Sequence, residues 1–337
     1  MNLRTRPSTK LAAVLGLLVA LVVVPRGALA EGPRVSVAEL SPQAESAIDK
    51  GLAFLAKSQR GDGAYGGQHS AAVTGLGLMA FMVKGHMPGE GRYGQSMDRA
   101  LSHLIARSNA GGGYIGSNMY EHALATLALS EAWGMSERPD IRDALKKAVE
   151  VILRAQHSSG GWRYQPVPLE HDVSVTVMQV VALASAQEAG IMVPAETIDK
   201  AMTYIKKCQK SDGGFSYQYS GGSSAFARSA ASVLGLMLGG ERDWPGVERG
   251  LAYITRHGDG EIKGGRHYYY GQYYAVQAMY QAGDDFYLNW YPRIHDRLVS
   301  VQRGDGSWRG EISEQYATAM SILILGVPYR FLPIYQR

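Results

Sequence analysis

The stretch Gln302-Arg-Gly-Asp-Gly-Ser-Trp308 combines a glutamine, two glycines and a tryptophan at fixed spacing. Gln59-Arg-Gly-Asp-Gly-Ala-Tyr65 and Gln209-Lys-Ser-Asp-Gly-Gly-Phe215 repeat this motif with a different aromatic residue. When weaker copies are included, the pattern returns about every 44 to 53 residues. Because self-similarity at such a period is typical of repeated supersecondary units, this motif decides the fold.

Six copies of the motif can be aligned along the chain. The glutamine position is occupied by Gln59, Ser108, Gln156, Gln209, Gly258 and Gln302. The aromatic position is occupied by Tyr65, Tyr114, Trp162, Phe215, Gly264 and Trp308. The fifth copy therefore lacks both characteristic side chains.

An amphipathic helix is predicted before each motif. Apolar residues spaced four and then three positions apart indicate one buried helix face. In the first five units these faces are Ile48, Leu52, Leu55; Met97, Leu101, Leu104; Leu145, Val149, Ile152; Ile198, Met202, Ile205; Val247, Leu251, Ile254. The sixth unit has Tyr291, His295 and Leu298 at these positions. The motif glycines end this helix and permit a tight turn.

A second helix, apolar on nearly all sides, follows each turn. These helices are predicted over residues 74–83, 122–133, 172–188, 225–238, 269–281 and 315–325, with starts near 70, 121, 172, 225, 269 and 314. Because they are apolar all round, they should be interior. The sequence thus predicts an all-α fold, an (α/α)6 toroid of six helical hairpins with an outer and an inner ring.

The Gln-x-x-x-Gly-x-Trp pattern resembles the repeat of the squalene and hopene cyclases and of the protein prenyltransferase β-subunits. The resemblance covers roughly residues 44–325 and implies their shared α/α toroid. It implies a structural role for the repeated glutamine and aromatic: the amide bonds helix-end backbone groups, and the ring packs beneath the turn.

The catalytic residues of these families are missing. Hopene-type cyclases start by protonating an alkene with an Asp-x-Asp-Asp run, and this chain has none. Prenyltransferase β-subunits bind zinc through Asp, Cys and His of the inner helices, whereas Cys208, the single cysteine, precedes Gln209 on an outer helix. We therefore predict neither a standard hopene cyclase nor a zinc prenyltransferase, and we expect no metal and no other cofactor.

Polar residues recur at the starts of the inner helices, where a closed ring would gather them around one mouth. The candidate catalytic residues are Glu121, His122, His171, Asp172 and Glu314, and the candidate ligand-binding residues are His69, Arg228, Tyr270, Gln272 and Tyr273. Carboxylates and imidazoles together could support acid–base chemistry. In the alternative interpretation, the acids stabilise helix N-termini and the histidines are exposed turn residues.

Asp172 is the strongest of these candidates because it combines a helix N-terminus with the adjacent His171. Asp is also a good N-cap residue, and the two roles are compatible. Burial would raise the pKa of its carboxyl group and a nearby cation would lower it. The sequence leaves the sign of this shift open.

Two aromatic segments remain open to interpretation. The fifth repeat holds Tyr268, Tyr269, Tyr270, Tyr273, Tyr274, Tyr280, Tyr287 and Tyr291. Most of these rings are expected to replace the missing motif in packing, although a face with Tyr270, Tyr273, Tyr274 and Gln277 could stack sugars or stabilise a cation. Residues 327–335, with two prolines, could cover the seam of the ring or dock a partner.

The first thirty residues indicate export. Arg4, Arg6 and Lys10 precede an apolar stretch from Leu11 to Val24, and an A-x-A sequence ends at residue 30. These features predict a cleaved signal peptide (1–30), a linker (31–44) and a single toroid domain (45–337) that is secreted or periplasmic. Its repeats lie near 45–96, 97–142, 143–197, 198–246, 247–290 and 291–337.

Charge and composition limit the class of protein and its possible partners. The chain has 337 residues, 46% of them apolar and 41 of them glycine, which excludes a disordered or collagen-like protein. Lys and Arg exceed Asp and Glu by 34 to 30, and the four extra positive charges all lie within the first thirty residues. We therefore expect no nucleic-acid partner and no transmembrane span in the mature chain.

Three functional classes remain. The toroid lumen could bind, and in one version transform, an apolar or isoprenoid-type ligand. It could be a non-catalytic toroid that binds a protein partner. It could also be a secreted (α/α)6 carbohydrate-active enzyme using Glu121, Asp172 and Glu314. We rank the lumen ligand first because the repeats resemble the terpenoid families.

Overall fold

The computed structural model describes residues 40–136, 138–265 and 267–335. In these residues the backbone forms α-helices and two short 3-10 helices, and no β-strand. The α-helices are α1 (Pro42–Ser58), α2 (Ser70–Met82), α3 (Gly94–Ala110), α4 (Met119–Gly134), α5 (Pro139–Arg154), α6 (Val173–Glu188), α7 (Ala195–Lys207), α8 (Phe226–Leu238), α9 (Pro245–Lys263), α10 (Tyr268–Ala282), α11 (Asp284–Val301) and α12 (Glu314–Leu325). The all-α prediction is confirmed.

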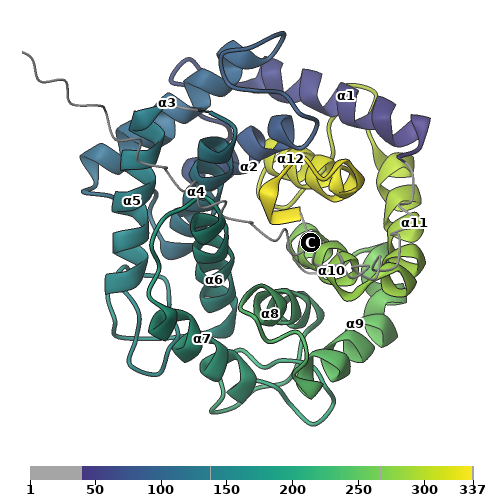
Figure 1. Cartoon of the computed structure of the whole chain (residues 1–337). Helices are drawn as coiled ribbons and strands as arrows, with labels where there is room; N and C mark the ends of the chain where they lie inside the picture. Colours follow the sequence, from purple (N-terminus) through teal and green to yellow (C-terminus); the bar gives the residue numbers. More distant parts are fainter. Residues whose placement is uncertain (1–39, 137, 266, 336–337) are drawn as a thin grey trace, which may run out of the picture. The chain divides into compact units, whose positions relative to one another are not determined.

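The helices alternate between two concentric rings. The odd-numbered helices form the outer ring and the even-numbered helices form the inner ring (Figure 1). The predicted apolar faces of the outer helices, such as Ile48, Leu52 and Leu55 of α1, are buried against the inner ring. Every inner helix starts within two residues of its predicted position. The structure is therefore the double-ringed toroid predicted from the repeats.

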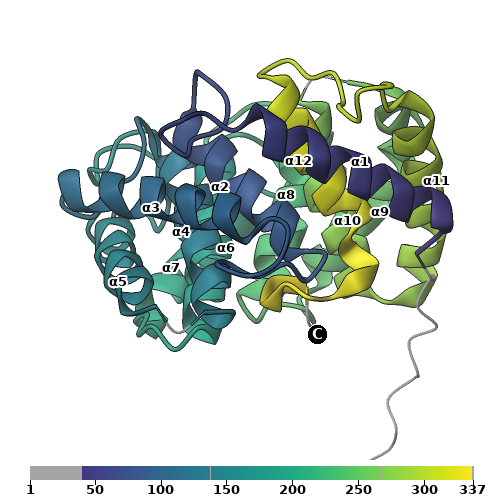
Figure 2. The same ribbon diagram turned by 90° about the horizontal axis from the view of Figure 1, so that it is seen from above.

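The ring closes between its first and last repeats. In Figure 2, α1 lies beside α11 and α12. The Gln302 amide donates to the carbonyl oxygen of Ala47 in α1 at 2.8 Å, and Ser41 Oγ lies 2.6 Å from His295 Nε2 of α11. Closure leaves no exposed terminal hairpin that would need a capping repeat.

The motif glutamines join each turn to the next outer helix. Gln156 Nε2 donates to the carbonyl oxygens of Gly160 in its own turn (3.0 Å) and of Thr197 in α7 (2.9 Å). The equivalent pairs of bonds are made by Gln59, Gln209 and Gln302. These bonds tie each turn to the N-terminal part of the next outer helix, which confirms the structural role that the resemblance implied.

The motif aromatics are buried beneath the turns. Trp162 and Trp308 have no exposed surface, and each indole N–H donates to a carbonyl oxygen of the preceding outer helix, Ile152 (2.7 Å) and Leu298 (2.8 Å). The backbone N–H of Trp162 also donates to Thr176 Oγ1 of the inner helix at 3.0 Å. One residue thereby fixes the turn to both helices of its hairpin.

In the second repeat, the structure shifts the motif positions by one residue from those assigned in the sequence alignment. Gly113 has φ 99°, and a Cβ there would overlap the Lys147 carbonyl of the next outer helix. In the third repeat, a Cβ at Gly160 would overlap the Lys200 carbonyl in the same way. The residue two places after Gly113 is Ile115, which is fully buried, whereas the expected aromatic Tyr114 is only partly buried. Tyr114 is thus displaced from the motif position because three consecutive glycines shift the turn.

The fifth repeat departs from the pattern more than the sequence suggested. Gly258 does not end the outer helix: it lies inside α9, which continues to Lys263. A Cβ at Gly258 would overlap the ring of Trp290, a buried residue of α11. Trp290 thus supplies a buried aromatic from the following helix. Tyr273, Tyr274, Tyr280, Tyr287 and Tyr291 are also buried, which confirms packing for most of the tyrosines.

The C-terminal segment both covers the seam and enters the ring. Its 3-10 helices are η1 (Val327–Tyr329) and η2 (Pro333–Tyr335). The Tyr329 hydroxyl donates to Glu45 Oε1 of α1 at 3.3 Å, while Leu332 and Ile334 are buried and η2 packs against α4 and α6. The segment (yellow in Figure 1) therefore has a structural role. The predicted signal peptide and most of the linker lie outside the described residues.

Candidate functional site

A cavity of about 750 Å³ opens where the inner helices begin. All six inner helices contribute to its wall. The lining residues are His69, Ala72, Val73, Asn118, Tyr120, Glu121, Leu124, Tyr164, Ser174, Met178, Tyr217, Ala225, Phe226, Ala227, Arg228, Glu261, His267, Tyr270, Ile312 and Tyr316. The predicted convergence of helix starts on one mouth is thus present, and we call this space the lumen cavity.

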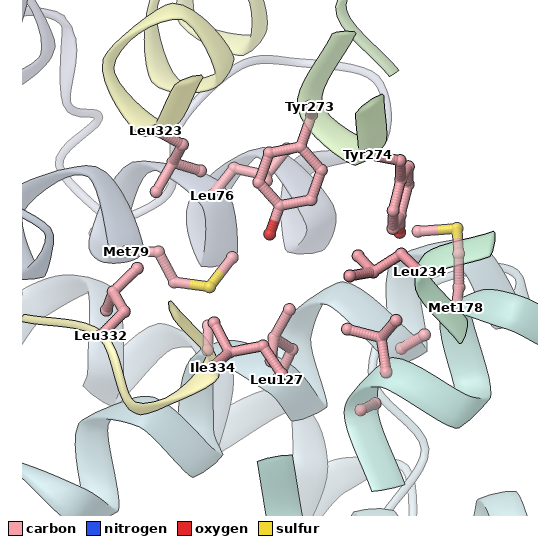
Figure 3. Packing of buried hydrophobic residues seen from close by; sticks show 14 of the residues in the cluster. Leu76, Met79, Leu127, Met178, Leu234, Tyr273, Tyr274, Leu323, Leu332 and Ile334 are labelled. Atoms are coloured by element: carbon pink, nitrogen blue, oxygen red, sulfur yellow. The ribbon is translucent and has the colours of Figure 1, made fainter. Parts of the chain in front are cut away.

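The opposite end of the ring is filled. Met79 and Leu127 of the inner helices lie beside Leu332 and Ile334 of the C-terminal segment, and Leu76, Leu234 and Leu323 belong to the same buried cluster (Figure 3). All seven side chains are buried. This end of the ring is therefore closed by apolar side chains, and a ligand would enter the lumen cavity from the mouth.

Aromatic side chains dominate the mouth. Tyr120, Tyr164, Tyr217, Tyr270, Tyr316 and Phe226 all line the cavity. Burial raises the pKa of Tyr120, Tyr217 and Tyr270, so these hydroxyls remain neutral at physiological pH. The Tyr270 hydroxyl is buried without a hydrogen bond to any described residue. Such a surface offers ring faces for apolar or cationic groups and a few neutral hydroxyls for polar ones.

Glu121 and His69 form a pair at the mouth. Glu121, in the first turn of α4, is only 4% exposed, and its Oε1 lies 3.2 Å from His69 Nδ1. Ser117 Oγ donates to the same oxygen at 2.5 Å, and Asn118 caps the helix through the Glu121 N–H at 3.1 Å. His69 precedes α2 in the left-handed conformation, with φ 56°. This pair can exchange a proton with a ligand in the cavity.

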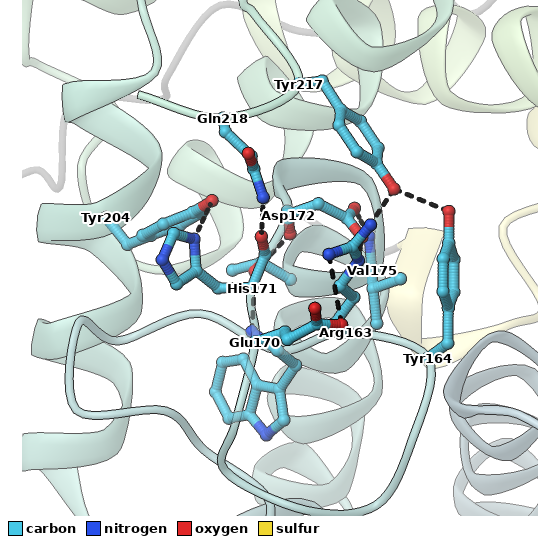
Figure 4. A network of polar contacts seen from close by, with 11 residues as sticks. Arg163, Tyr164, Glu170, His171, Asp172, Val175, Tyr204, Tyr217 and Gln218 are labelled. Atoms are coloured by element: carbon cyan, nitrogen blue, oxygen red, sulfur yellow. Dashed lines mark hydrogen bonds and ion pairs between the residues drawn. The ribbon is translucent and has the colours of Figure 1, made fainter. Parts of the chain in front are cut away.

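Asp172 lies one layer behind the cavity wall. It caps α6, with Oδ1 accepting from the Val175 N–H at 2.9 Å, and its Oδ2 accepts from the Tyr217 hydroxyl at 3.0 Å (Figure 4). The Tyr217 hydroxyl in turn lies 2.6 Å from that of Tyr164. Both tyrosines line the cavity, so a chain of hydroxyls connects the buried carboxyl group to the lumen.

The direction of the pKa shift of Asp172, which the sequence left open, is upward. Burial raises the pKa of its carboxyl group to about 6, and this outweighs the lowering by hydrogen bonds from Val175 and Tyr217. Arg163 Nε is 4.0 Å away and lowers the pKa less. Asp172 therefore titrates closer to neutrality than an ordinary carboxyl group, which suits a group that exchanges protons near pH 6.

Arg228 and Glu261 bring opposite charges to another part of the wall. Arg228 Nε donates to the Phe215 carbonyl at 2.9 Å, and its guanidinium also bonds the Ser223 carbonyl. Much of this guanidinium therefore holds the loop before α8. Glu261 extends from α9, and partial burial raises the pKa of its carboxyl group. Glu261 was not among the residues predicted from the sequence.

Several predicted residues do not line the cavity. His122 is fully buried: its Nδ1 accepts from the Ile115 N–H at 3.1 Å and its Nε2 lies 3.0 Å from the Ala148 carbonyl. It occupies the place that Thr176 has in the third repeat, and burial lowers its pKa to about 4. His122 is therefore a structural residue, and its expected place at the mouth is corrected.

The other outlying candidates are spread over three regions. His171 Nδ1 lies 2.9 Å from the Tyr204 hydroxyl, on the side of the loop away from the cavity (Figure 4). Glu314 is half exposed and pairs with Arg303 outside the cavity. Gln272 is fully buried in α10, and Tyr273 is buried deeper in the ring (Figure 3). Of the ten predicted residues, His69, Glu121, Arg228 and Tyr270 line the cavity, and Asp172 reaches it through Tyr217.

A second buried carboxylate was missed altogether. Glu131 of α4 has no exposed surface, and burial raises the pKa of its carboxyl group to about 7. It accepts from Ser185 Oγ at 2.6 Å and from the Ile334 N–H of the C-terminal segment at 3.4 Å. It therefore belongs to the closed end of the ring. Its signal in the sequence is its place inside the apolar helix predicted over residues 122–133, where a charged side chain is exceptional.

Tyr164 and Tyr217 also had a sequence signal. Each stands two residues after a motif aromatic, Trp162 and Phe215 respectively, and no other motif in the alignment has a tyrosine there.

Among the described residues, no group of three or more His, Cys, Asp or Glu side chains is arranged to hold a metal ion. No helix in the described part of the chain has the length and apolar character needed to cross a bilayer.

Comparison with known proteins supports the terpenoid cyclase-like toroid. The family described as squalene-hopene cyclase C-terminal domain matches residues 122–264. A drimenyl diphosphate synthase from Streptomyces showdoensis is 28% identical over 159 residues, which are 43% of this chain. The match spans only 29% of that enzyme's length.

Solved structures share the fold at low sequence identity. The type II terpene cyclase MstE from Scytonema superposes with a TM-score of 0.58 and 14% identity, covering 86% of this chain and 99% of its own. It has been solved with its substrate, geranylgeranyl dihydroxybenzoate. Cellobiose 2-epimerase from Bacillus thermoamylovorans superposes with a TM-score of 0.62 and 13% identity, covering 84% and 98% of the two chains. The resemblance predicted from the repeats is thereby confirmed for the fold.

Proposed function

We propose that the lumen cavity binds an apolar ligand of isoprenoid type, with its polar end at the mouth. The proposal rests on the separation of apolar and charged side chains along the cavity wall. Apolar side chains such as Val73, Leu124 and Met178 line it beside the tyrosine rings, while the ionisable His, Glu and Arg side chains are limited to the starts of α2, α4, α8 and α10 and the end of α9. A volume of about 750 Å³ is within the range of ligand pockets.

The chemistry of the wall favours binding and mild proton transfer over alkene protonation. Alkene protonation demands a very acidic donor, whereas Asp172 has a raised pKa and is separated from the cavity by Tyr217. Glu121 with His69, and Asp172 through Tyr217, are suited to protonating or deprotonating a polar group of the ligand. The substrate of the Scytonema cyclase supports a geranylgeranyl chain as the first ligand to test. The proposal includes export, on the basis of residues 1–30.

The test is isothermal titration of the mature chain with geranylgeraniol. We expect one site per chain in the wild type. Leu124→Trp, which places an indole in the cavity, should abolish binding, whereas Met192→Trp, at a position that is 89% exposed, should not. Equal binding by both variants would contradict a lumen site. Saturable binding of a purified protein partner but of no lipid would favour the non-catalytic toroid instead.

A second candidate is a carbohydrate ligand in the same cavity. Two carboxylates, Glu121 and Glu261, line it together with aromatic rings, and this combination is also suited to sugars. The carboxylate set predicted from the sequence is not assembled, because Glu314 faces away and pairs with Arg303. Titration with cellobiose and mannooligosaccharides separates the candidates, since displacement of geranylgeraniol by a sugar would favour this second function.

A further inference from the structure

A second cavity adjoins the lumen at the fifth repeat. It has a volume of about 670 Å³ and is formed by the connection between α9 and α10, the end of α11 and the loop before α12. Its lining residues are Gly264, Gly265, His267, Tyr268, Tyr269, Tyr270, Arg297, Val301, Arg309, Gly310, Glu311, Ile312 and Tyr316. We call it the side chamber.

The side chamber follows from the loss of the motif in the fifth repeat. In four of the other five repeats a turn with a buried aromatic, such as Trp162 or Trp308, separates the outer helix from the inner helix. In the fifth repeat α9 runs on to Lys263, and only residues 264–267 connect it to α10. Among the described residues no motif aromatic packs beside Tyr268, and the side chamber lies there.

The side chamber and the lumen cavity share part of their walls. His267, Tyr270, Ile312 and Tyr316 line both. The buried Tyr270 hydroxyl, which has no hydrogen bond to a described residue, lies at this junction. The two cavities therefore adjoin at Tyr270, which is where one ligand would pass from the lumen into the side chamber.

The side chamber is lined by more positively than negatively charged side chains. Arg297 of α11 and Arg309 of the following loop both line it and are exposed, against a single carboxylate, Glu311. The Arg309 guanidinium makes no hydrogen bond or ion pair with another described side chain, and Tyr269 fixes its backbone by donating to the Arg309 carbonyl at 2.7 Å. Two guanidinium groups with several neutral tyrosine hydroxyls are well suited to an oxyanion.

We infer that the side chamber binds the oxyanion head group, phosphate or carboxylate, of the amphiphile whose apolar chain occupies the lumen cavity. This inference rests on the proposed function and names its ligand class: an anionic isoprenoid rather than a neutral one. Arg297 and Arg309 contact the head group, and the tyrosines at the junction contact the first part of the chain.

The experiment compares three ligands that share one chain: geranylgeraniol, geranylgeranyl monophosphate and geranylgeranoic acid. With the wild-type mature chain we expect at least one anion to bind about tenfold more tightly than the alcohol, as charge-assisted hydrogen bonds to arginine allow. The preference should weaken as salt increases. Which anion binds more tightly identifies the head group as phosphate or carboxylate.

Two sets of variants test whether the preference for an anion over the alcohol depends on the side chamber. The double variant Arg297→Gln with Arg309→Gln should lose the preference while keeping its affinity for the alcohol. The control Arg303→Gln removes a guanidinium that pairs with Glu314 outside both cavities, and should keep the preference. Val301→Trp should fill the side chamber and weaken only the anions, whereas Leu288→Trp, also exposed on α11, should not.

The possible failures are distinguishable. Equal affinity of the wild type for the alcohol and both anions would overturn this inference and leave the proposed function intact. A preference that survives the double variant would also overturn it, because the charge would then be recognised elsewhere. If none of the three ligands binds, the proposed function fails and this inference fails with it.

Discussion

The hydroxyl of Tyr217 donates a hydrogen bond to Oδ2 of Asp172 at 3.0 Å, across forty-five positions of sequence. Tyr217 belongs to the loop before α8, whereas Asp172 caps α6. The bond connects a fully buried carboxyl group to a side chain that lines the lumen cavity. Because the motif turns of two adjacent repeats supply the two partners, packing of one repeat against the next brings them together.

Substitution of Asp172 separates its capping role from its charge. Asp172→Asn keeps an N-cap oxygen for the Val175 N–H, so we expect a melting temperature close to that of the wild type. Asp172→Ala loses the cap and leaves Tyr217 without its acceptor, which should lower the free energy of unfolding by about 1 to 2 kcal/mol. Thermal melting measures the first quantity and urea denaturation the second.

The same pair of variants tests a role in the lumen. Loss of geranylgeraniol binding in Asp172→Asn at unchanged melting temperature would assign the carboxyl group a function beyond capping. Unchanged binding would leave it as a cap. Tyr217→Phe, which removes the connecting hydroxyl but keeps the ring, should reproduce whichever effect Asp172→Asn has on binding.

Glu131 should make stability depend on pH. Its pKa is raised to about 7 in the folded chain, from 4.5, so the folded state binds the proton more tightly than the unfolded state. Stability is therefore greatest below pH 4.5 for this group and is lost as pH rises through 7, by about 3 kcal/mol.

The matched experiment compares Glu131→Gln with Glu188→Gln, which changes an exposed residue at the end of α6. Between pH 5 and pH 8 the wild type and Glu188→Gln should lose more unfolding free energy than Glu131→Gln does. Parallel pH profiles for all three proteins would show that Glu131 titrates normally in the folded chain.

The C-terminal segment should stabilise the ring through its buried side chains. Leu332 is fully buried against the closed end, whereas its neighbour Phe331 is 50% exposed. Leu332→Ala should cost about 2 to 5 kcal/mol, as large-to-small substitutions in cores do. Phe331→Ala should cost less than half as much. Similar losses in denaturation experiments would mean that Leu332 does not form part of the core.

A motif glutamine should matter to stability and not to ligand binding. Gln156→Ala removes the two bonds to Gly160 and Thr197, and about 1 to 3 kcal/mol of unfolding free energy should be lost. Gln95→Ala, at an exposed position of α3, is the control. A stable Gln156→Ala protein that no longer binds geranylgeraniol would contradict the structural role.

Export predicts a shortened chain. Because an A-x-A sequence ends at Ala30, intact mass measurement of protein from the native host should find Glu31 as the first residue. Replacing Ala28 and Ala30 by Arg should block this cleavage. A secreted chain that still starts at Met1 would contradict the prediction.

The sequence by itself determined the repeating architecture. The spacing of Ile48, Leu52 and Leu55, the glycines of the turn and the apolar second helix act locally, so each hairpin can be derived from its own residues. Ring closure also followed, because six similar hairpins with buried inner helices need a common interior. The starts of the inner helices were therefore predicted to within two residues.

Only the tertiary structure decided which side chains reach the lumen. Adjacent residues of a helix point about 100° apart, so Glu121 lines the cavity while His122 points outward and bonds the turn. Glu261 became notable only through its partial burial, and the contact of Glu131 with the distant Ile334 N–H likewise needed the folded chain. Helix rotation and burial depend on packing against other repeats, and neither is encoded in the residues next to a given position.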